Sequence, residues 1–242
     1  MKTTLLLFVS VLFQSLLFAQ NIGPKLIWGE NNNTFGEYAK AYAFGTDVVL
    51  ISKNLSTTEG RYIVMDENLD TLASKAYTYS EPIFFTEGKA INDSVFAISG
   101  TTTASANQHA AFVLLLDKYG NLKNNFVFDK ISDQTDANLE VFNDSTFIFS
   151  YSSNDTELTT VMMRLDGSIL WTDRSSITGY MNLGDITYDG GNSIFSFQSL
   201  NTGSRLVEMD TLGVKQRAVE MDNVTDPRQV CFFQDSIFLL AG

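Results

Sequence analysis

The chain has 242 residues, and its 28 acidic and 16 basic residues give a net charge of −12. This excess of negative charge argues against a nucleic acid as partner, because binding to a phosphate backbone depends on clustered cations. A single cysteine, Cys231, excludes an internal disulfide, so burial of its hydrophobic residues, 44% of the chain, must stabilise the fold.

The first twenty residues predict a secretory signal peptide. Lys2 provides a short positive start, an apolar stretch runs from Leu5 to Ala19, and Ala19-Gln20 forms a small-residue boundary. A transmembrane helix is the alternative, but it needs about 20 apolar residues, and this stretch is shorter and contains polar ones. We therefore expect cleavage near Ala19-Gln20, a secreted or cell-surface location, and no membrane insertion of the mature chain, residues 21–242.

Two apolar landmarks recur along the mature chain and indicate a repeat of roughly 45–50 residues. The first is a turn followed by an apolar run, and its copies contain Ser94, Ser145, Ser193 and Ser236. The second is an apolar run that ends in an aspartate, at Asp66, Asp117, Asp166 and Asp210. Because both landmarks keep the same phase over four copies, they predict a repeated structural unit.

Each unit resolves into four short strands, called a to d, and no helical periodicity follows the signal peptide. Strands b and c are near-continuous apolar runs, such as Val95–Ile98 and Phe112–Leu116, so both faces of each sheet must be covered. Stacked blades of a β-propeller cover both faces, whereas two β-sandwich modules, the alternative, would show cleaner alternation. We expect an all-β propeller of four-stranded antiparallel blades, with units at residues 37–78, 86–129, 137–174 and 184–220 and a partial unit at 228–242.

Both ends of the chain resemble parts of this unit. Lys25–Gly29 resembles a strand d, and Leu240–Gly242 ends a strand b. The two ends either combine into one composite fifth blade or belong to a longer propeller whose C-terminal part is missing, and we favour the second interpretation. The prediction is an incomplete propeller with about four full blades and partial blades at both ends.

The two rims of such a propeller differ in their predicted loops. The a–b and c–d turns share one rim, and the b–c and d–a loops share the other. The b–c loops are predicted to be long and rich in Ser, Thr and Asn, at residues 52–60, 101–110, 151–158 and 198–203. Because binding sites concentrate on loops carried by a rigid scaffold, we expect a protein or glycan partner on this long-loop rim, with purely solvated loops as the alternative.

The tight-turn rim carries a recurring Asp-Ser or Asp-Thr pair followed by an apolar residue or Thr. This pattern resembles the O-glycosylation acceptor pattern of exported proteins in one gliding-type bacterial phylum. It implies candidate acceptors at Thr71, Ser94, Ser145, Thr211 and Ser236. Turn chemistry alone explains the same residues, because Asp and Ser favour the start of β-turns.

No sequence motif indicates catalysis, a metal or a cofactor. His109 is the only histidine, and it lies in the polar stretch 107–109 without a nucleophile motif nearby. The acidic turn Asp66–Asp70 lacks the glycine and the distal glutamate of an EF-hand loop. Residues 164–171 resemble the Asp-box of sialidase propellers but lack its leading serine. We therefore expect no metal site and no cofactor.

The whole chain resembles secreted β-propeller repeat proteins that carry a C-terminal type IX secretion sorting domain. The resemblance rests on the signal ending Phe18-Ala19-Gln20, on strand starts such as Asp93–Phe96, and on Leu-Asp-x-x-Gly turns such as Leu116–Gly120. It implies export to the cell surface or the medium and implies no reaction. We predict an exported binding or adhesion propeller; a glycan-directed enzyme or accessory module and a structural spacer in a larger surface protein are the alternatives.

Overall fold

The computed structural model describes residues 38–53, 59–78, 83–105, 108–128, 137–154, 157–176, 182–200, 203–222, 227–233 and 236–241. All regular elements in these ranges are β-strands, which form four four-stranded sheets and one two-stranded sheet. No helix that is long and apolar enough to cross a membrane occurs in these ranges. The predicted signal peptide and the predicted N-terminal strand, Lys25–Gly29, lie outside the described residues.

Each sheet is an antiparallel meander in which strands pair in chain order. The first blade contains β1 (Tyr38–Phe44), β2 (Asp47–Lys53), β3 (Glu59–Met65) and β4 (Thr71–Thr78). The second contains β5 (Ile83–Asn92), β6 (Val95–Ser105), β7 (Gln108–Leu116) and β8 (Leu122–Phe128). The third contains β9 (Ala137–Asn143), β10 (Thr146–Asn154), β11 (Glu157–Arg164) and β12 (Ile169–Ser176). The fourth contains β13 (Asn182–Tyr188), β14 (Ser193–Leu200), β15 (Gly203–Asp210) and β16 (Lys215–Asp222), and β17 (Pro227–Phe233) pairs with β18 (Ser236–Ala241).

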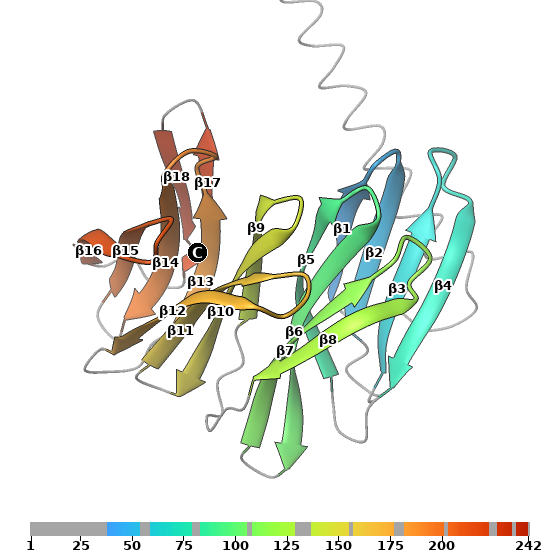
Figure 1. Ribbon diagram of the computed structural model, residues 1–242, viewed down its shortest axis with the longest axis horizontal. Coiled ribbons are helices and arrows are strands. Elements are labelled where there is room, and N and C mark those ends of the chain that lie inside the picture. Colours follow the sequence, from blue (N-terminus) through green and yellow to red (C-terminus); the bar gives the residue numbers. More distant parts are fainter. Residues whose placement is uncertain are drawn as a thin grey trace, which may run out of the picture.

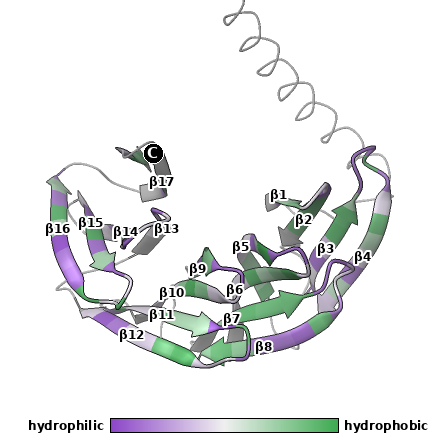
Figure 2. Cartoon of the chain, turned by 45° about the horizontal axis from the view of Figure 1, so that its top comes forward, coloured by the Kyte–Doolittle hydropathy of each residue, from purple (hydrophilic) through white to green (hydrophobic). Residues whose placement is uncertain are grey.

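The blades stand side by side in an arc (Figure 1). Figure 2 shows the first strand of every blade on the inner side of the arc and the fourth strand on its outer side, with an opening between β17 and β1. This is the arrangement of a β-propeller, and it confirms the predicted fold class of four-stranded antiparallel blades.

Apolar side chains of strands b and c pack against both neighbouring blades. Phe96 and Tyr62 belong to one buried cluster, between the first and second blades. Ala97, the next residue of β6, belongs to a different cluster with Phe147 of the third blade. Successive side chains of a strand point to opposite faces, so a continuous apolar run is what a doubly covered blade requires.

The b–c connections are shorter than the sequence analysis expected. The ladders continue to Ser105↔Gln108 in the second blade, and the third and fourth blades likewise close with only two residues between their last paired positions. His109, expected in a loop, has its backbone in β7 opposite Thr103. The prediction of long loops at 101–110, 151–158 and 198–203 is therefore wrong, because the Ser- and Thr-rich segments pair as strands. Residues 54–58 of the first such connection lie outside the described residues.

The c–d turns are built as the repeated aspartates predict. In the second blade, Asp117 Oδ1 accepts hydrogen bonds from the backbone N–H groups of Tyr119 at 2.9 Å and Asn121 at 2.8 Å. Gly120 adopts a φ of 76°, and a Cβ at this position would lie 2.7 Å from the Tyr62 ring of the first blade. The glycine is thus required twice, by the left-handed backbone and by the neighbouring ring. Leu69 occupies the corresponding place in the first blade, with a φ of 64°.

Candidate ligand site in the central channel

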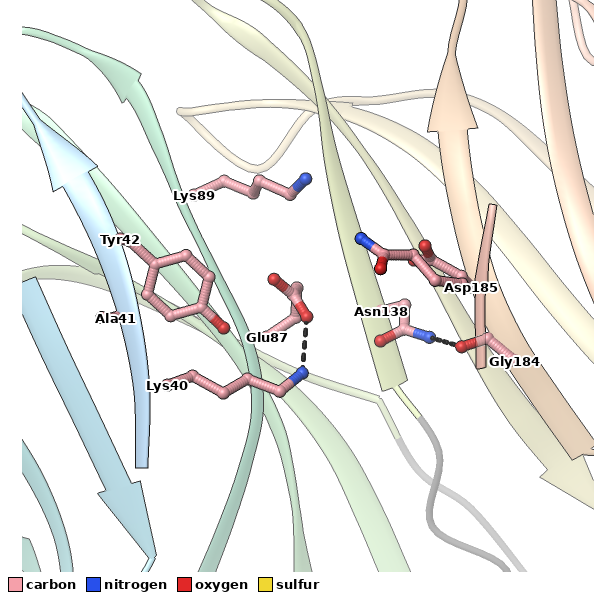
Figure 3. A pocket seen from close by; sticks show the side chains of 9 residues that line it. Lys40, Ala41, Tyr42, Glu87, Lys89, Asn138, Gly184 and Asp185 are labelled. Carbon is pink, nitrogen blue, oxygen red and sulfur yellow. Dashed lines mark hydrogen bonds and ion pairs between the residues drawn. The ribbon is translucent and has the colours of Figure 1, made fainter. Parts of the chain in front are cut away.

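A polar cavity of about 350 Å³ opens where the innermost strands face one another. Figure 3 shows its side chains converging from both sides of the channel. The polar groups come from the first strand of every blade: Lys40 and Tyr42 on β1, Glu87 and Lys89 on β5, Asn138 on β9, Asp185 on β13 and Gln229 on β17. The fold therefore brings together residues that are far apart in the sequence.

A series of hydrogen bonds ties each innermost strand to the next. In chain order they run from Lys40 Nζ to Thr86 O at 2.6 Å, from Thr86 Oγ1 to Ala137 O, from Asn138 Nδ2 to Gly184 O at 3.1 Å, and from Val230 N to Asp185 Oδ2 at 3.0 Å. Among the described strands, none pairs with strand a on its channel side, so its backbone groups need other partners. These bonds supply partners to some of them and hold the cavity walls in place.

Two ion pairs neutralise most of the charge in the channel. Lys40 Nζ lies 2.7 Å from Glu87 Oε2, as Figure 3 shows, and Lys89 Nζ lies 3.1 Å from Glu140 Oε2. Burial by itself would lower the pKa of Lys89, but the charges of Glu140 and Glu87 outweigh it, so the pKa is raised. Lys89 is therefore protonated at neutral pH, and both lysines already have an acidic partner.

Asp185 has a different environment from the paired acids. Its Oδ1 accepts a hydrogen bond from the backbone N–H of Ile186 at 2.8 Å, and its Oδ2 accepts one from Val230 N at 3.0 Å. Within the described ranges, no Lys or Arg side chain forms an ion pair with it. Burial raises the pKa of Asp185 to about 6, and the charge of Glu87 adds to this, although the two N–H donors and Lys89 oppose it.

Tyr42 places a hydroxyl group in the same cavity. Its oxygen is buried and forms no well-aligned hydrogen bond among the described residues, but Glu87 and the backbone of Gly88 lie beside it. Figure 3 shows the hydroxyl pointing toward Glu87. Burial, followed by the charge of Glu87, raises the pKa of Tyr42 far above its usual value, so the hydroxyl keeps its proton. The channel thus contains a protonated donor whose neighbour, Glu87, is also paired with Lys40.

A second, smaller cavity of about 230 Å³ lies between the third and fourth blades, on the outer side of the sheets. It is lined by Ser175 of β12 and by residues of β15 and β16, including Arg205 and Lys215. Lys215 forms an ion pair with Asp173 at 3.3 Å. No group of three His, Cys, Asp or Glu side chains suited to hold a metal ion occurs in the described part of the chain.

The five candidate glycosylation residues lie at a–b or c–d turns, away from the channel. Ser94 and Ser145 are exposed, and their hydroxyls donate to Asn92 Oδ1 and Asn143 Oδ1 within tight a–b turns. The other three are Thr71 and Ser236, which are exposed and start β4 and β18, and Thr211, which is half-buried in a c–d turn. Their modification stays a prediction.

None of the channel residues is predicted from the sequence. The predicted partner surface is the b–c and d–a rim, and much of the d–a rim falls on residues outside the described ranges, such as 79–82 and 177–181. A usable signal existed in strand a, where polar residues such as Glu87 and Asp185 interrupt apolar sequence in each unit. That signal identifies a strand, but the convergence of five strands is visible only in the fold.

No family model matches the chain, and no curated protein matches it in sequence. Among solved structures, it is similar to a subtype N11 neuraminidase-like protein of A/flat-faced bat/Peru (H18N11), with a TM-score of 0.51 and 11% identity over 80% of this chain and 62% of that chain. A prolyl endopeptidase has a TM-score of 0.49 and 11% identity, covering 84% of this chain and 31% of its own. A subtype N10 neuraminidase-like protein of A/little yellow-shouldered bat/Guatemala has a TM-score of 0.47 and 10% identity, covering 80% and 68%. At this identity the likeness to the N11 protein shows the propeller fold alone.

Proposed function

We propose that this protein is an exported binding propeller that holds a hydroxyl-rich glycan residue in its central channel. The observation that carries the proposal is the cavity of about 350 Å³, to which the first strand of each described blade contributes a polar or charged side chain. This volume lies at the lower end of the range for small-molecule sites, roughly 300–1,000 Å³.

The chemistry of the lining favours a ligand with many hydroxyl groups. Asn138 and Gln229 offer amides that both donate and accept, while Glu87 and Asp185 offer carboxylates that accept. An apolar ligand would leave the remaining donor and acceptor positions of these groups buried without hydrogen-bond partners, which costs about 1–3 kcal/mol for each unsatisfied group. A sugar ring, with hydroxyls around its edge, matches this set of donors and acceptors.

The hydrogen bonds between innermost strands also favour a binding role. They join β1 to β5, β5 to β9, β9 to β13 and β13 to β17, so the walls of the cavity are fixed relative to one another. A site whose walls are already fixed loses little conformational entropy when the ligand binds. Export, and a type IX route in particular, is the part of the proposal that rests on the sequence, chiefly on residues 1–20.

Saturation-transfer NMR with the full chain and a panel of methyl glycosides tests the proposal. We expect transfer from the protein to at least one glycoside, and we expect Gln229→Leu to weaken that binding about tenfold, because one hydrogen bond to a ligand contributes about 1 kcal/mol or more. Gln216→Leu, the same change on the outermost strand β16, serves as the control and should leave binding unchanged. Absence of transfer to every glycoside would refute the proposal.

A catalytic role on glycans is a second candidate, and one observation favours it. Glu87 and Asp185 line the same cavity, and their surroundings differ: Glu87 is paired with Lys40, whereas Asp185 has a pKa raised to about 6. Two carboxyl groups in unlike environments are what acid–base hydrolysis of a glycosidic bond uses. Release of 4-nitrophenol from nitrophenyl glycosides, abolished by Glu87→Gln, would favour the enzyme; binding without release favours the binding propeller.

A further inference from the structure

Three acids and two lysines meet at the channel, because Glu140, which pairs with Lys89, adds to the two acids of the cavity wall. Two lysines, Lys40 and Lys89, are each matched by a glutamate at 2.7 Å and 3.1 Å. Asp185 is the remaining ionisable acid of the cavity wall, and its described partners are two backbone N–H groups. Asp185 is therefore the one acid of the three that forms no ion pair in the described ranges, although the charge of Lys89 acts on it.

The Asp185 carboxylate also retains capacity for a ligand. A carboxylate offers about four acceptor positions, and the N–H groups of Ile186 and Val230 use two of them. The Tyr42 hydroxyl adds a buried donor to the same cavity, beside the Glu87 carboxylate. The cavity thus presents a carboxylate that has no ion-pair partner among the described residues, together with a buried hydroxyl donor, and this set suits a ligand with a cationic group and a neighbouring oxygen.

We infer that the channel selects a glycan residue with a free amino group, whose ammonium binds the Asp185 carboxylate while a hydroxyl or ring oxygen accepts from Tyr42. The inference rests on the proposed function and names the ligand class of that same site. An ammonium group compensates a half-buried carboxylate better than a neutral hydroxyl does, because a charge-assisted hydrogen bond is roughly twice as strong as a neutral one. An acidic sugar is disfavoured, since both lysines already have acidic partners.

The net charge of the protein also favours a ligand with a cationic group. A net charge of −12 creates a negative potential that raises the local concentration of cations and speeds their association. The groups that face Asp185 across the cavity are Glu87 and Lys89 from β5 and Lys40 and Tyr42 from β1, while Gln229 from β17 is neutral. Glu140 of β9 is engaged with Lys89.

Isothermal titration of the full chain with glucosamine, glucose and N-acetylglucosamine tests the inference. At about pH 7 we expect glucosamine to bind about tenfold more tightly than the two sugars without an ammonium group, as a charge-assisted hydrogen bond implies. Asp185→Asn should remove this preference. The control, Asp173→Asn, changes an ion-paired acid on the outermost strand β12 and should leave the preference unchanged.

The wild-type protein provides a second test that does not depend on how Asp185→Asn folds. Lowering the pH from about 7 to about 5 protonates Asp185, so the preference for glucosamine should fall steadily through pH 6 while glucose binding stays constant. Equal affinity for all three sugars at both pH values would overturn the inference and leave the proposed function standing. Failure of every sugar to bind would overturn both.

Discussion

The interface between the first and second blades differs from the interface between the third and fourth in what fills it. The first is packed with aromatic rings: Tyr62, Phe85, Phe96 and Phe112 belong to one cluster, and the Phe96 and Tyr62 ring centroids lie 5.8 Å apart. The second has aliphatic residues at its centre, such as Ile148 and Val207. The same repeat unit can thus pack against a neighbouring blade through aromatic or through aliphatic side chains.

Polar residues take part of the space at the second interface. Ser150 and Thr160 are buried, and their side chains lie on the same faces of their strands as the core residues of this interface. Their hydroxyl oxygens lie 2.8 Å apart. Arg205 lies five residues before the aspartate of its c–d turn, and Phe112 occupies the equivalent position in the second blade. Phe112 is buried, whereas Arg205 lines the outer cavity of about 230 Å³. Replacing a ring by hydrogen-bonded groups preserves the blade but leaves a hollow beside it.

The largest expected effect is at the aromatic interface. Phe96 is fully buried, and its ring lies within 6 Å of the rings of Tyr42, Phe44 and Tyr62. Phe96→Ala should lower the free energy of unfolding by about 3–5 kcal/mol, because the cavity left behind has no side chain free to fill it. Urea unfolding measures the change. A loss below about 1 kcal/mol would contradict tight packing at this interface.

The second-largest effect is expected at Gly120, which lies in the second blade against the Tyr62 ring of the first blade. Gly120→Ala adds a Cβ 2.7 Å from the Tyr62 ring and retains a φ of 76°, so we expect a loss of about 2–3 kcal/mol. Gly45→Ala is the matched control, because Gly45 has a φ of 62° but no atom within 4 Å of the added Cβ. Gly45→Ala should cost about 1–2 kcal/mol in the same unfolding experiment. Equal costs at both glycines would show that the contact with Tyr62 contributes nothing.

The polar interface allows a double-mutant test. Ser150→Ala removes the partner of the buried Thr160 hydroxyl and should cost about 1–3 kcal/mol. The double variant Ser150→Ala, Thr160→Val removes both hydroxyls and should cost less than Ser150→Ala and Thr160→Val combined, as chemical denaturation will measure. Strict additivity would mean that the two hydroxyls do not interact.

The smallest expected effect is at the outer cavity. Arg205 Nη2 donates to Gln198 Oε1 at 2.9 Å, and Arg205→Met retains the aliphatic stem while removing this donor. We expect a loss of about 1 kcal/mol, detectable as a small decrease in the melting temperature. Arg217→Met, which removes an ion pair with Glu208 on the more exposed surface, should cost about 0–1 kcal/mol. If Arg205→Met instead raises the melting temperature, an apolar side chain packs better than a polar one at this interface, as it does at the interface between the first and second blades.

Several features of the fold could be predicted from local chemistry. The apolar runs around Phe96 and Leu114 must be strands covered on both faces, because nothing else in a chain without helical periodicity can bury them. Asp117 and Gly120 form the c–d turn that Asp and Gly favour in any context. The strands of the b–c segments could not be predicted, because Ser and Thr are typical of loops by composition, yet their side chains form hydrogen bonds inside a sheet, as Ser150 does.

The sequence by itself determined the repeat, the all-β class and the stacking of blades, because these depend on periodicities within a few residues and on the need to bury apolar runs. Only the tertiary structure decided the site. Glu87, Asn138 and Asp185 are ordinary polar strand residues until three neighbouring blades place them around one channel. The raised pKa of Asp185 likewise comes from burial by neighbouring strands, a property that no local pattern encodes.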